Sequence, residues 1–538
     1  MRNLKMRFSY LSCQNIVSSL YLFVVLGFLP LFYKYQYADM GDAKYNIFLR
    51  SSILYVLILF SFLFFQFIWK IKKEGIQKWK ETLKLDFSLL DQMVLLYFGC
   101  TTISFLLSSF KEGGLWGAAG WNMGYISQIL FVAVYFLISR RWKFHQGFLW
   151  LLMASSQIAF LLAILHRFDV DILHIYGDLK LAYKIQFLST IGQSSWYSSF
   201  LCTVFPMGLY LFFISDRKGI RITSGIYSIL SMCTLVTQNT DSAFLSLFFV
   251  LLVFFYLSFD SQKQGRRFCE VLMVVFGSFT FMGICQRIFS ERIIPLDSLS
   301  IFMSQSALSQ TLLVAVVLIY ILFGKKSKIS LAEKKTMAKV KQHSRKIFWI
   351  LAAAIGVGII VMIFFILLNS TGILYTHFGY QNVNNYLLFA DNWGNQRGFA
   401  WRYTCEVYSE LPFLRKMIGV GPDCYAFYME SIPKYAQRME EFWGGLTLTN
   451  AHNEYLTKLL NLGLLGLASY LFMLGSAVFL FIKGRREHIL LPAFALCTIS
   501  YMTHNIFCYE QVCCTPFFYI LLGFGSNLIH NKIQKSTY

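Results

Sequence analysis

Residues 451–482 read AHNEYLTKLLNLGLLGLASYLFMLGSAVFLFI, a polar pentapeptide followed by a predominantly apolar run from Leu456 to Ile482. About 20 such residues are enough for a helix to cross a bilayer. Runs of this kind recur along all 538 residues, of which 57% are hydrophobic and only 14% are charged. Because a single span must bond its own backbone groups, it has to be a helix. The sequence therefore predicts an all-α, polytopic bundle of transmembrane helices.

The formal net charge of +21 could suggest a nucleic-acid partner, but its distribution indicates a membrane topology. Lys and Arg cluster in short loops between the apolar runs, as the positive-inside rule expects. The N-terminus carries Arg2, Lys5 and Arg7 before the first run. We therefore expect a multi-pass protein of the cell membrane with both termini cytoplasmic, no nucleic-acid partner, and residues 451–455 on the outer side.

The alternation of apolar runs and basic loops predicts about fourteen spans. Their expected positions are 16–33, 51–69, 88–108, 122–139, 147–166, 196–215, 222–238, 243–259, 269–285, 306–323, 347–368, 455–482, 489–507 and 515–530. The chain then divides into transmembrane helices over 1–368, a large extracytoplasmic loop over 369–454 and C-terminal transmembrane helices over 455–538.

The extracytoplasmic loop is the longest polar segment, and it is rich in aromatic residues. It contains Trp393, Trp401 and Trp443, many tyrosines, and charges of both signs. This composition differs from that of a disordered linker. We expect a compact subdomain with short helices lying on the membrane.

Two motifs in this loop suit an anionic ligand. Arg397 and Arg402 flank Trp401, and the planar guanidinium fork donates paired hydrogen bonds to phosphate. Farther on, Gly419 and Gly421 surround a turn where the backbone can approach a ligand closely. The commoner roles of such residues are a surface salt bridge for the arginines and an ordinary turn for the glycines.

His452 is the candidate for chemistry. Thr449 and Asn450 are suitable N-caps and Glu454 suits the first turn, which places His452 in the exposed first turn of the helix. The positive helix end disfavours a protonated imidazole, so His452 would be neutral near pH 7, as a general base requires. The alternative is an interfacial histidine that only bonds the loop, and the residues alone give both interpretations equal weight.

Together these residues resemble the O-antigen ligase and O-antigen polymerase superfamily of membrane glycosyltransferases. The family pattern is an Arg-x-x-x-Trp element, a Gly-x-Gly-Pro turn, and His-Asn before a helix with a Leu-Gly-Leu-Leu-Gly-Leu run. This chain matches it with Arg397 and Trp401, residues 419–422, His452-Asn453 and residues 462–467. Residues 190–196 and 239–242 are similar to two further family segments, but they lack the family's Asn-Pro and arginine respectively.

The resemblance implies transfer of a glycan from an undecaprenyl-diphosphate carrier to a hydroxyl acceptor, with neither a metal nor another cofactor. It implies catalytic roles for Arg397, at the diphosphate, and for His452, at the reacting centre. The arginine missing near Asp241 could be replaced by Arg402, Arg167 or Lys184. The expected substrate-binding residues are Arg402, Trp401, Gly419, Gly421, Asn453, Gln193, Lys184 and Asp241.

The implied partners are the lipid-linked glycan donor, a glycan or other hydroxyl acceptor, the bilayer and polysaccharide assembly proteins. Polymerase and ligase reactions share the motif, and the sequence does not separate them. The rival class is a flippase for the same lipid, which should show charges deep within its spans and repeated halves. A non-catalytic component of a polysaccharide assembly complex is the third interpretation.

Overall fold

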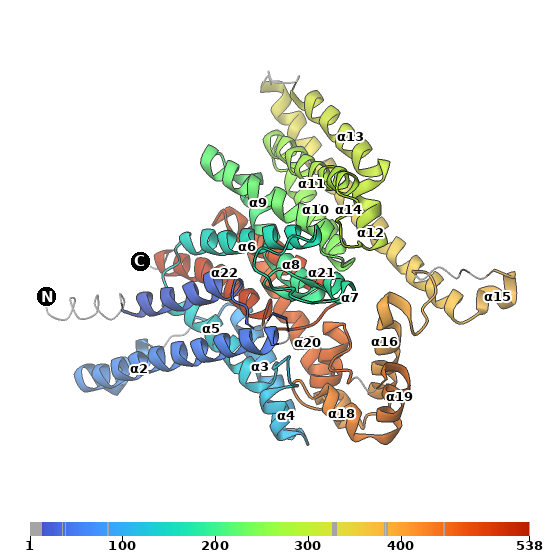
Figure 1. Cartoon of the computed structure of the whole chain (residues 1–538). Helices are drawn as coiled ribbons and strands as arrows, with labels where there is room; N and C mark the ends of the chain where they lie inside the picture. Colours follow the sequence, from blue (N-terminus) through green and yellow to red (C-terminus); the bar gives the residue numbers. More distant parts are fainter. Residues whose placement is uncertain are drawn as a thin grey trace.

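Residues 454–482 form most of helix α20 (Glu454–Lys483), and residues 451–453 directly precede it. The helix packs between α3 (Leu89–Leu107) and α21 (Leu491–His504). In the computed structural model the helix over Cys13–Phe28 begins, and the helix α22 (Thr515–Ser536) ends, at one end of a helical bundle, and the helices of the predicted loop lie at the other (Figure 1). The structure describes residues 13–34, 36–37, 39–82, 86–324, 331–380, 382, 386–444 and 447–536. Arg2, Lys5 and Arg7, which guided the predicted topology, lie outside these ranges.

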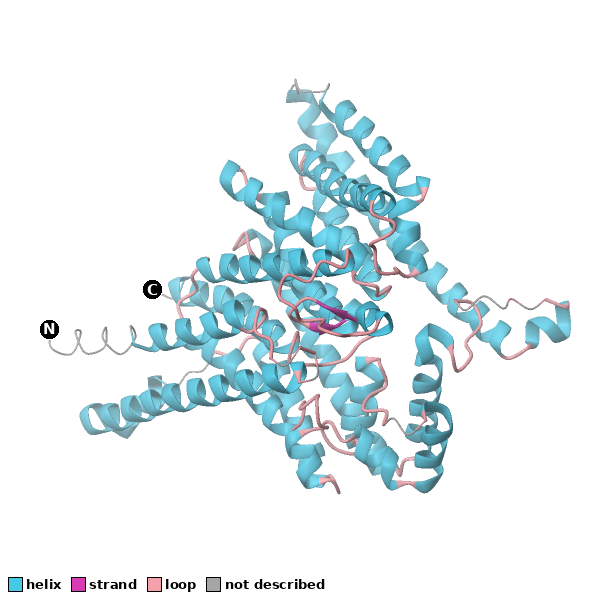
Figure 2. Cartoon of the chain, in the orientation of Figure 1, coloured by secondary structure: helices cyan, strands magenta, loops and turns pink. Residues whose placement is uncertain are grey.

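Helices dominate the described chain, and one short hairpin is the exception (Figure 2). Before the loop the elements are a helix over Cys13–Phe28 that ends in η1 (Phe23–Phe28), α2 (Met40–Thr82), α4 (Lys111–Trp116), α5 (Tyr125–Arg141), α6 (Gly147–Arg167), α7 (Leu181–Gln186), β1 (Phe187–Leu188), β2 (Gly192–Gln193), α8 (Ser194–Ile214), α9 (Lys218–Thr237), α10 (Ser242–Ser258), α11 (Gln262–Ile288), α12 (Ser298–Gln305), α13 (Ala307–Gly324) and α14 (Leu331–Ser370). The later elements are α15 (Ile373–Phe378), α16 (Trp393–Glu410), α17 (Phe413–Ile418), α18 (Tyr425–Ser431), α19 (Pro433–Trp443), η2 (Gly484–Arg486) and α22 (Thr515–Ser536).

Each of the fourteen apolar stretches overlaps a helix, and the all-α membrane class is confirmed. Within the described residues, eight helices are long and apolar enough to cross a membrane, or nine if the bent pair α12 and α13 forms one span. The expected count of fourteen is therefore not confirmed. Several of the other stretches form shorter helices, such as α21 and α10.

The helices differ greatly in how much of their surface the protein covers. In α8, 89% of the most apolar window is buried, whereas in the corresponding window of α14 no residue is buried. Helix α8 therefore belongs to the centre of the bundle. Helix α14 turns its apolar side chains outward, as a helix surrounded by lipid does.

Helix α20 is broken at Gly463, whose φ of 70° and ψ of −173° are not helical. The break leaves the carbonyls of Leu460 and Asn461 without their usual partners four residues on. The loop supplies replacements, because the backbone N–H groups of Val420 and Gly421 donate to them at 3.1 and 2.9 Å. The two glycine-rich motifs recognised in the sequence therefore bind each other.

The loop helices have a small core of their own. Phe399, Tyr403 and Val407 of α16 pack with Tyr425 of α18 and Tyr435 of α19, all of them buried. Leu460 of α20 belongs to the same cluster. The loop is thus a folded layer attached to α20.

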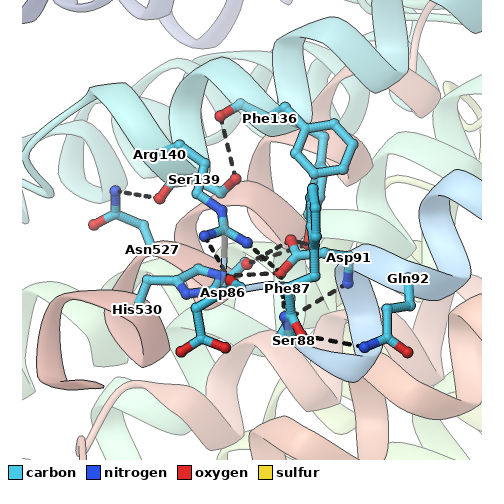
Figure 3. A network of polar contacts seen from close by, with 12 residues as sticks. Asp86, Phe87, Ser88, Asp91, Gln92, Phe136, Ser139, Arg140, Asn527 and His530 are labelled. Atoms are coloured by element: carbon cyan, nitrogen blue, oxygen red, sulfur yellow. Dashed lines mark hydrogen bonds and ion pairs between the residues drawn. The ribbon is translucent and has the colours of Figure 1, made fainter. Parts of the chain in front are cut away.

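At the end of the bundle away from the loop, a polar network around Asp91 connects three helices (Figure 3). The fully buried Asp91 carboxylate binds Arg140 of α5 at 2.6 Å and His530 of α22 at 2.9 Å, and it accepts the Tyr135 hydroxyl at 2.7 Å. Ser88 completes a capping box with Asp91 at the start of α3. One side chain therefore ties α3, α5 and α22 together.

Replacing Gly463 with alanine should detach the loop from α20. A Cβ there would overlap the Met417 carbonyl, and the left-handed backbone is strained for alanine, so we expect a loss of about 3 kcal/mol. The expected result is a lower thermal unfolding midpoint in nanodiscs and faster proteolysis of the loop. Gly475→Ala in the same helix is the control, because nothing lies within 4 Å of its added Cβ. Equal behaviour of the two variants would contradict the docking.

Asp91→Asn should lower the free energy of unfolding by about 3 kcal/mol, because the buried contact with Arg140 would lose its counter-charge. The thermal unfolding midpoint measures this loss. Asp86→Asn is the matched control, since the Asp86 side chain is exposed and only its backbone carbonyl accepts from Arg140. An unfolding midpoint for Asp91→Asn equal to that of the control would refute the role of the network.

Candidate functional site

His452 lies in a tight turn immediately before α20. Its φ of 50° is left-handed, which is uncommon for a residue other than glycine. The turn is held because the His452 N–H donates to Asn450 Oδ1 at 2.9 Å and the Leu456 N–H donates to Asn453 Oδ1 at 3.0 Å. Asn453 is thus the N-cap, which corrects the expectation of Thr449 or Asn450. His452 precedes the cap instead of occupying the first helical turn.

The imidazole of His452 is half-buried rather than exposed, and its ring is available. Within the described residues no group forms a hydrogen bond to either ring nitrogen. The ring meets Tyr509 edge to face, with centroids 5.2 Å apart. Burial, reinforced by the nearby Arg397 charge, lowers the pKa of His452 to about 4. It is therefore neutral at pH 7, as predicted, although the causes are burial and Arg397 instead of the helix end.

Arg397 faces the same place from α16. Three left-handed residues, Gly394 to Gln396, precede it and turn the chain so that its Nη1 donates to the Gly394 carbonyl at 2.7 Å. Its Nε donates to the Phe507 carbonyl at 3.2 Å. Burial lowers the pKa of Arg397, opposed by Cys508, Tyr509 and Asp241. A guanidinium stays charged in proteins, so this site holds one fixed positive charge beside a neutral imidazole.

The connection between α21 and α22 is the centre of the site, and the sequence analysis did not identify it. The Phe507 carbonyl accepts from Arg397, and the Tyr509 ring contacts His452. Cys508 lies 3.0 Å from the Ser199 hydroxyl of α8. The only sequence signal for this segment is a pair of polar residues, Glu510 and Gln511, between two apolar runs.

A series of aromatic contacts connects the site to the start of α8. The Tyr509 ring meets Trp121 at 4.9 Å, and Trp121 meets Trp196 at 5.3 Å. Gln193 directly precedes α8 and lies three residues before Trp196. The segment around Gln193 therefore reaches the site through two tryptophans.

Trp401 belongs to an aromatic group beside Arg397, one helical turn farther along α16. Its ring stacks on Phe507 at 5.6 Å and meets Trp393 at 5.2 Å. Its indole N–H is buried and has no hydrogen-bond partner in the described residues. Trp401 and Arg397 thus lie on the same side of the site.

The other cationic candidates are engaged elsewhere. Arg402 is exposed and pairs with Asp391, and Lys184 pairs with Asp169 at 2.7 Å. The fully buried Arg167 donates to the Thr237 carbonyl at 2.7 Å. Their substrate roles remain predictions.

Asp241 is exposed at the start of α10 and accepts the Tyr386 hydroxyl at 3.4 Å. It is close enough to influence Arg397 electrostatically. Asp241 thus lies near Arg397, and its substrate role remains a prediction. Gly419 and Gly421 instead make the backbone contacts to α20, and their substrate roles also remain predictions.

In the described part of the chain, no group of three or more His, Cys, Asp or Glu side chains is arranged to hold a metal ion. The residues that meet at the site are thus a guanidinium, an imidazole, indole and phenol rings, and a carboxylate. This set can bind an anion and exchange a proton.

Comparison with known protein families matches residues 293–471 to the O-antigen ligase family model. The matched range is about a third of the chain, and it includes Arg397, Trp401, both loop glycines and His452. Comparison with curated proteins found no match. The family match confirms the resemblance drawn from the motifs: residues 293–471 of this chain are similar to the O-antigen ligase family.

Proposed function

We propose that this protein is a membrane glycosyltransferase that polymerises or ligates an undecaprenyl-diphosphate-linked oligosaccharide on the outer face of the cytoplasmic membrane. The observation that carries the proposal is the meeting of Arg397 and His452 at one site, within a segment matched by the O-antigen ligase family. The product would be a cell-surface polysaccharide.

Arg397 would bind the diphosphate of the donor. The guanidinium is positive in a partly buried place, where an electrostatic interaction is stronger than in water. Its Nη2 has no hydrogen-bond partner in the described residues, so that nitrogen can donate to a phosphate oxygen. Neutralising charge on the diphosphate makes it a better leaving group.

His452 would assist removal of the acceptor proton. The acceptor oxygen would attack the anomeric carbon while the bond from that carbon to the diphosphate oxygen breaks and its electron pair stays with the diphosphate. Attack from the face opposite the leaving group inverts the anomeric carbon. Bound diphosphate would also offset the charge of Arg397, so the pKa of His452 would rise when the base is needed.

A flippase is less well supported. Among the described residues, the buried Lys, Arg, Asp and Glu side chains on helices lie near helix ends rather than at mid-span: Lys44, Asp91, Glu454 and Lys458 in the first two turns, and Arg167 in the last turn. Flipping of the lipid-linked glycan in vesicles, without any glycosyl transfer, would replace the proposal. Polymerase and ligase are distinguished by gel analysis, because a polymerase makes a ladder from the lipid-linked repeat unit alone.

Arg397→Gln should weaken binding of geranylgeranyl diphosphate, a short analogue of the carrier, by about 10- to 100-fold. This is the effect of losing a hydrogen bond with charge worth about 1.5–3 kcal/mol. Titration calorimetry with the protein in nanodiscs measures it. Arg438→Gln, at the partly exposed Glu406 pair of the loop, is the control and should bind as wild type. Equal affinity of the two variants would remove Arg397 from the diphosphate site.

His452→Ala should lower kcat about 100-fold or more while leaving geranylgeranyl diphosphate binding nearly unchanged, as expected for a general base. The donor is the lipid-linked glycan that accumulates in a strain lacking this protein. Since the neutral form is active and its pKa is about 4, kcat/KM should stay level from pH 7 to about 5 and fall below that. Wild-type polymer formation by His452→Ala, or an acid limb centred near 6.5, would refute this assignment.

A further inference from the structure

A second group of buried charges lies beside the site, and the proposed function does not use it. Lys458 Nζ is 2.7 Å from Glu510 Oε2 and 3.6 Å from Glu454 Oε1. Gln128 Nε2 also donates to Glu510 Oε2, at 3.0 Å. Glu454, Lys458 and Glu510 are only 1%, 6% and 8% exposed, so these are interior charges. We call these three residues the acid–lysine cluster.

The cluster borders a small cavity of about 30 Å³, whose other lining residues include Trp121, Asp423, Asn450 and Tyr509. This space holds one or two water molecules and is too small for a sugar ring. It is also polar, since carboxyl, amide and ammonium groups surround it.

Several polar atoms of the cavity lining are unsatisfied. Among the described residues, Glu454 Oε1, Glu510 Oε1 and Asn461 Oδ1 are buried and accept no hydrogen bond. Each such atom is destabilising unless water or a proton satisfies it. Water in the cavity would meet this need and would connect the carboxyl groups.

The charges around the cavity do not balance. Three carboxyl groups, from Asp423, Glu454 and Glu510, face the single ammonium of Lys458. Full ionisation would leave two uncompensated negative charges in the interior, which is unfavourable. Burial raises the pKa of Asp423 to about 7, against two backbone N–H donors from Ala118 and Met123. Asp423 is therefore the cavity carboxyl that binds and releases a proton near neutral pH.

The cavity is next to His452. Tyr509 lines it and also packs against the imidazole at 5.2 Å. Asn450 lines it too, and its side-chain Oδ1 accepts a hydrogen bond from the backbone N–H of His452. A histidine with a pKa of about 4 does not retain a proton at pH 7, so the proton must pass to another group.

We propose that the acid–lysine cluster and its cavity form the proton-accepting site of the transfer reaction. The O–H bond of the acceptor breaks, its oxygen bonds to the anomeric carbon, and the diphosphate leaves with the electron pair of the broken C–O bond. The proton moves by way of His452 and cavity water to Glu510, the member that Lys458 holds at hydrogen-bond distance. It then returns to bulk water. This inference rests on the proposed function.

The other ionisable groups near these carboxyls are phenols and buried thiols; the thiols are Cys424 near Asp423, and Cys508 and Cys514 near Glu454. Tyr97 of α3, Tyr45 of α2 and Tyr519 of α22 interact electrostatically with Glu510 or Asp423. A phenol is neutral at pH 7. Proton exchange within the cavity therefore falls to its carboxyl groups.

Glu510→Gln tests the proposal, because glutamine keeps the shape but cannot take the proton. We expect kcat for transfer of the accumulated lipid-linked glycan to fall about 100-fold. In the variant kcat should rise with pH between 6 and 9, since bulk hydroxide must then accept the proton. Binding of geranylgeranyl diphosphate and the unfolding midpoint should stay near wild type. Glu510→Asp should restore part of the rate.

Glu441→Gln, the same change at an exposed position of α19, is the control and should match wild type. Unchanged kcat and pH profile in Glu510→Gln would overturn the proposal, as would a rate loss that follows only from lost stability or lost diphosphate binding. Wild-type protein that transfers no glycan would instead refute the proposed function itself.

Discussion

The carbonyls of Leu460 and Asn461 impose the constraint on which the rest of the structure depends. A backbone acceptor freed inside a membrane helix has to find a donor within the protein. The turn at Val420 and Gly421 is that donor, and Ser104 of α3 adds a hydroxyl to Asn461 at 2.9 Å. The break in α20 therefore attaches the loop to the bundle. Arg397 and His452, which lie beside Phe399 and Ala451 of the loop core, are fixed relative to each other as a result.

The site has a positive charge at Arg397 on one side and negatively charged carboxyl groups on the other. Arg397 supplies a positive field where a phosphate would lie, and this field adds to the effect of burial in keeping His452 deprotonated. On the other side, the carboxyls around Lys458 make the cavity negative. An anion and a proton released in the same reaction would thus be drawn in opposite directions, with the Tyr509 ring between them.

The sequence predicted the parts of the molecule that depend on local patterns. The apolar runs located the helices, and the motifs identified Arg397 and His452, which the structure places near each other. The sequence could not predict the break at Gly463, because a glycine inside an apolar run is also tolerated in an intact helix. It misplaced the cap of α20, because a left-handed residue at His452 moves the helix start to Asn453. Residues 507–511 were missed because their role arises from contacts with four distant segments.

The position of residues 507–511 limits how the family-matched segment can be used as a unit. That segment ends at residue 471, yet Arg397 is held by the Phe507 carbonyl and His452 rests on Tyr509. The matched region thus does not contain all the contacts that hold its own site residues in place. A chimera that exchanges the loop would therefore have to exchange the connection between α21 and α22 with it, because the two segments hold the site residues together.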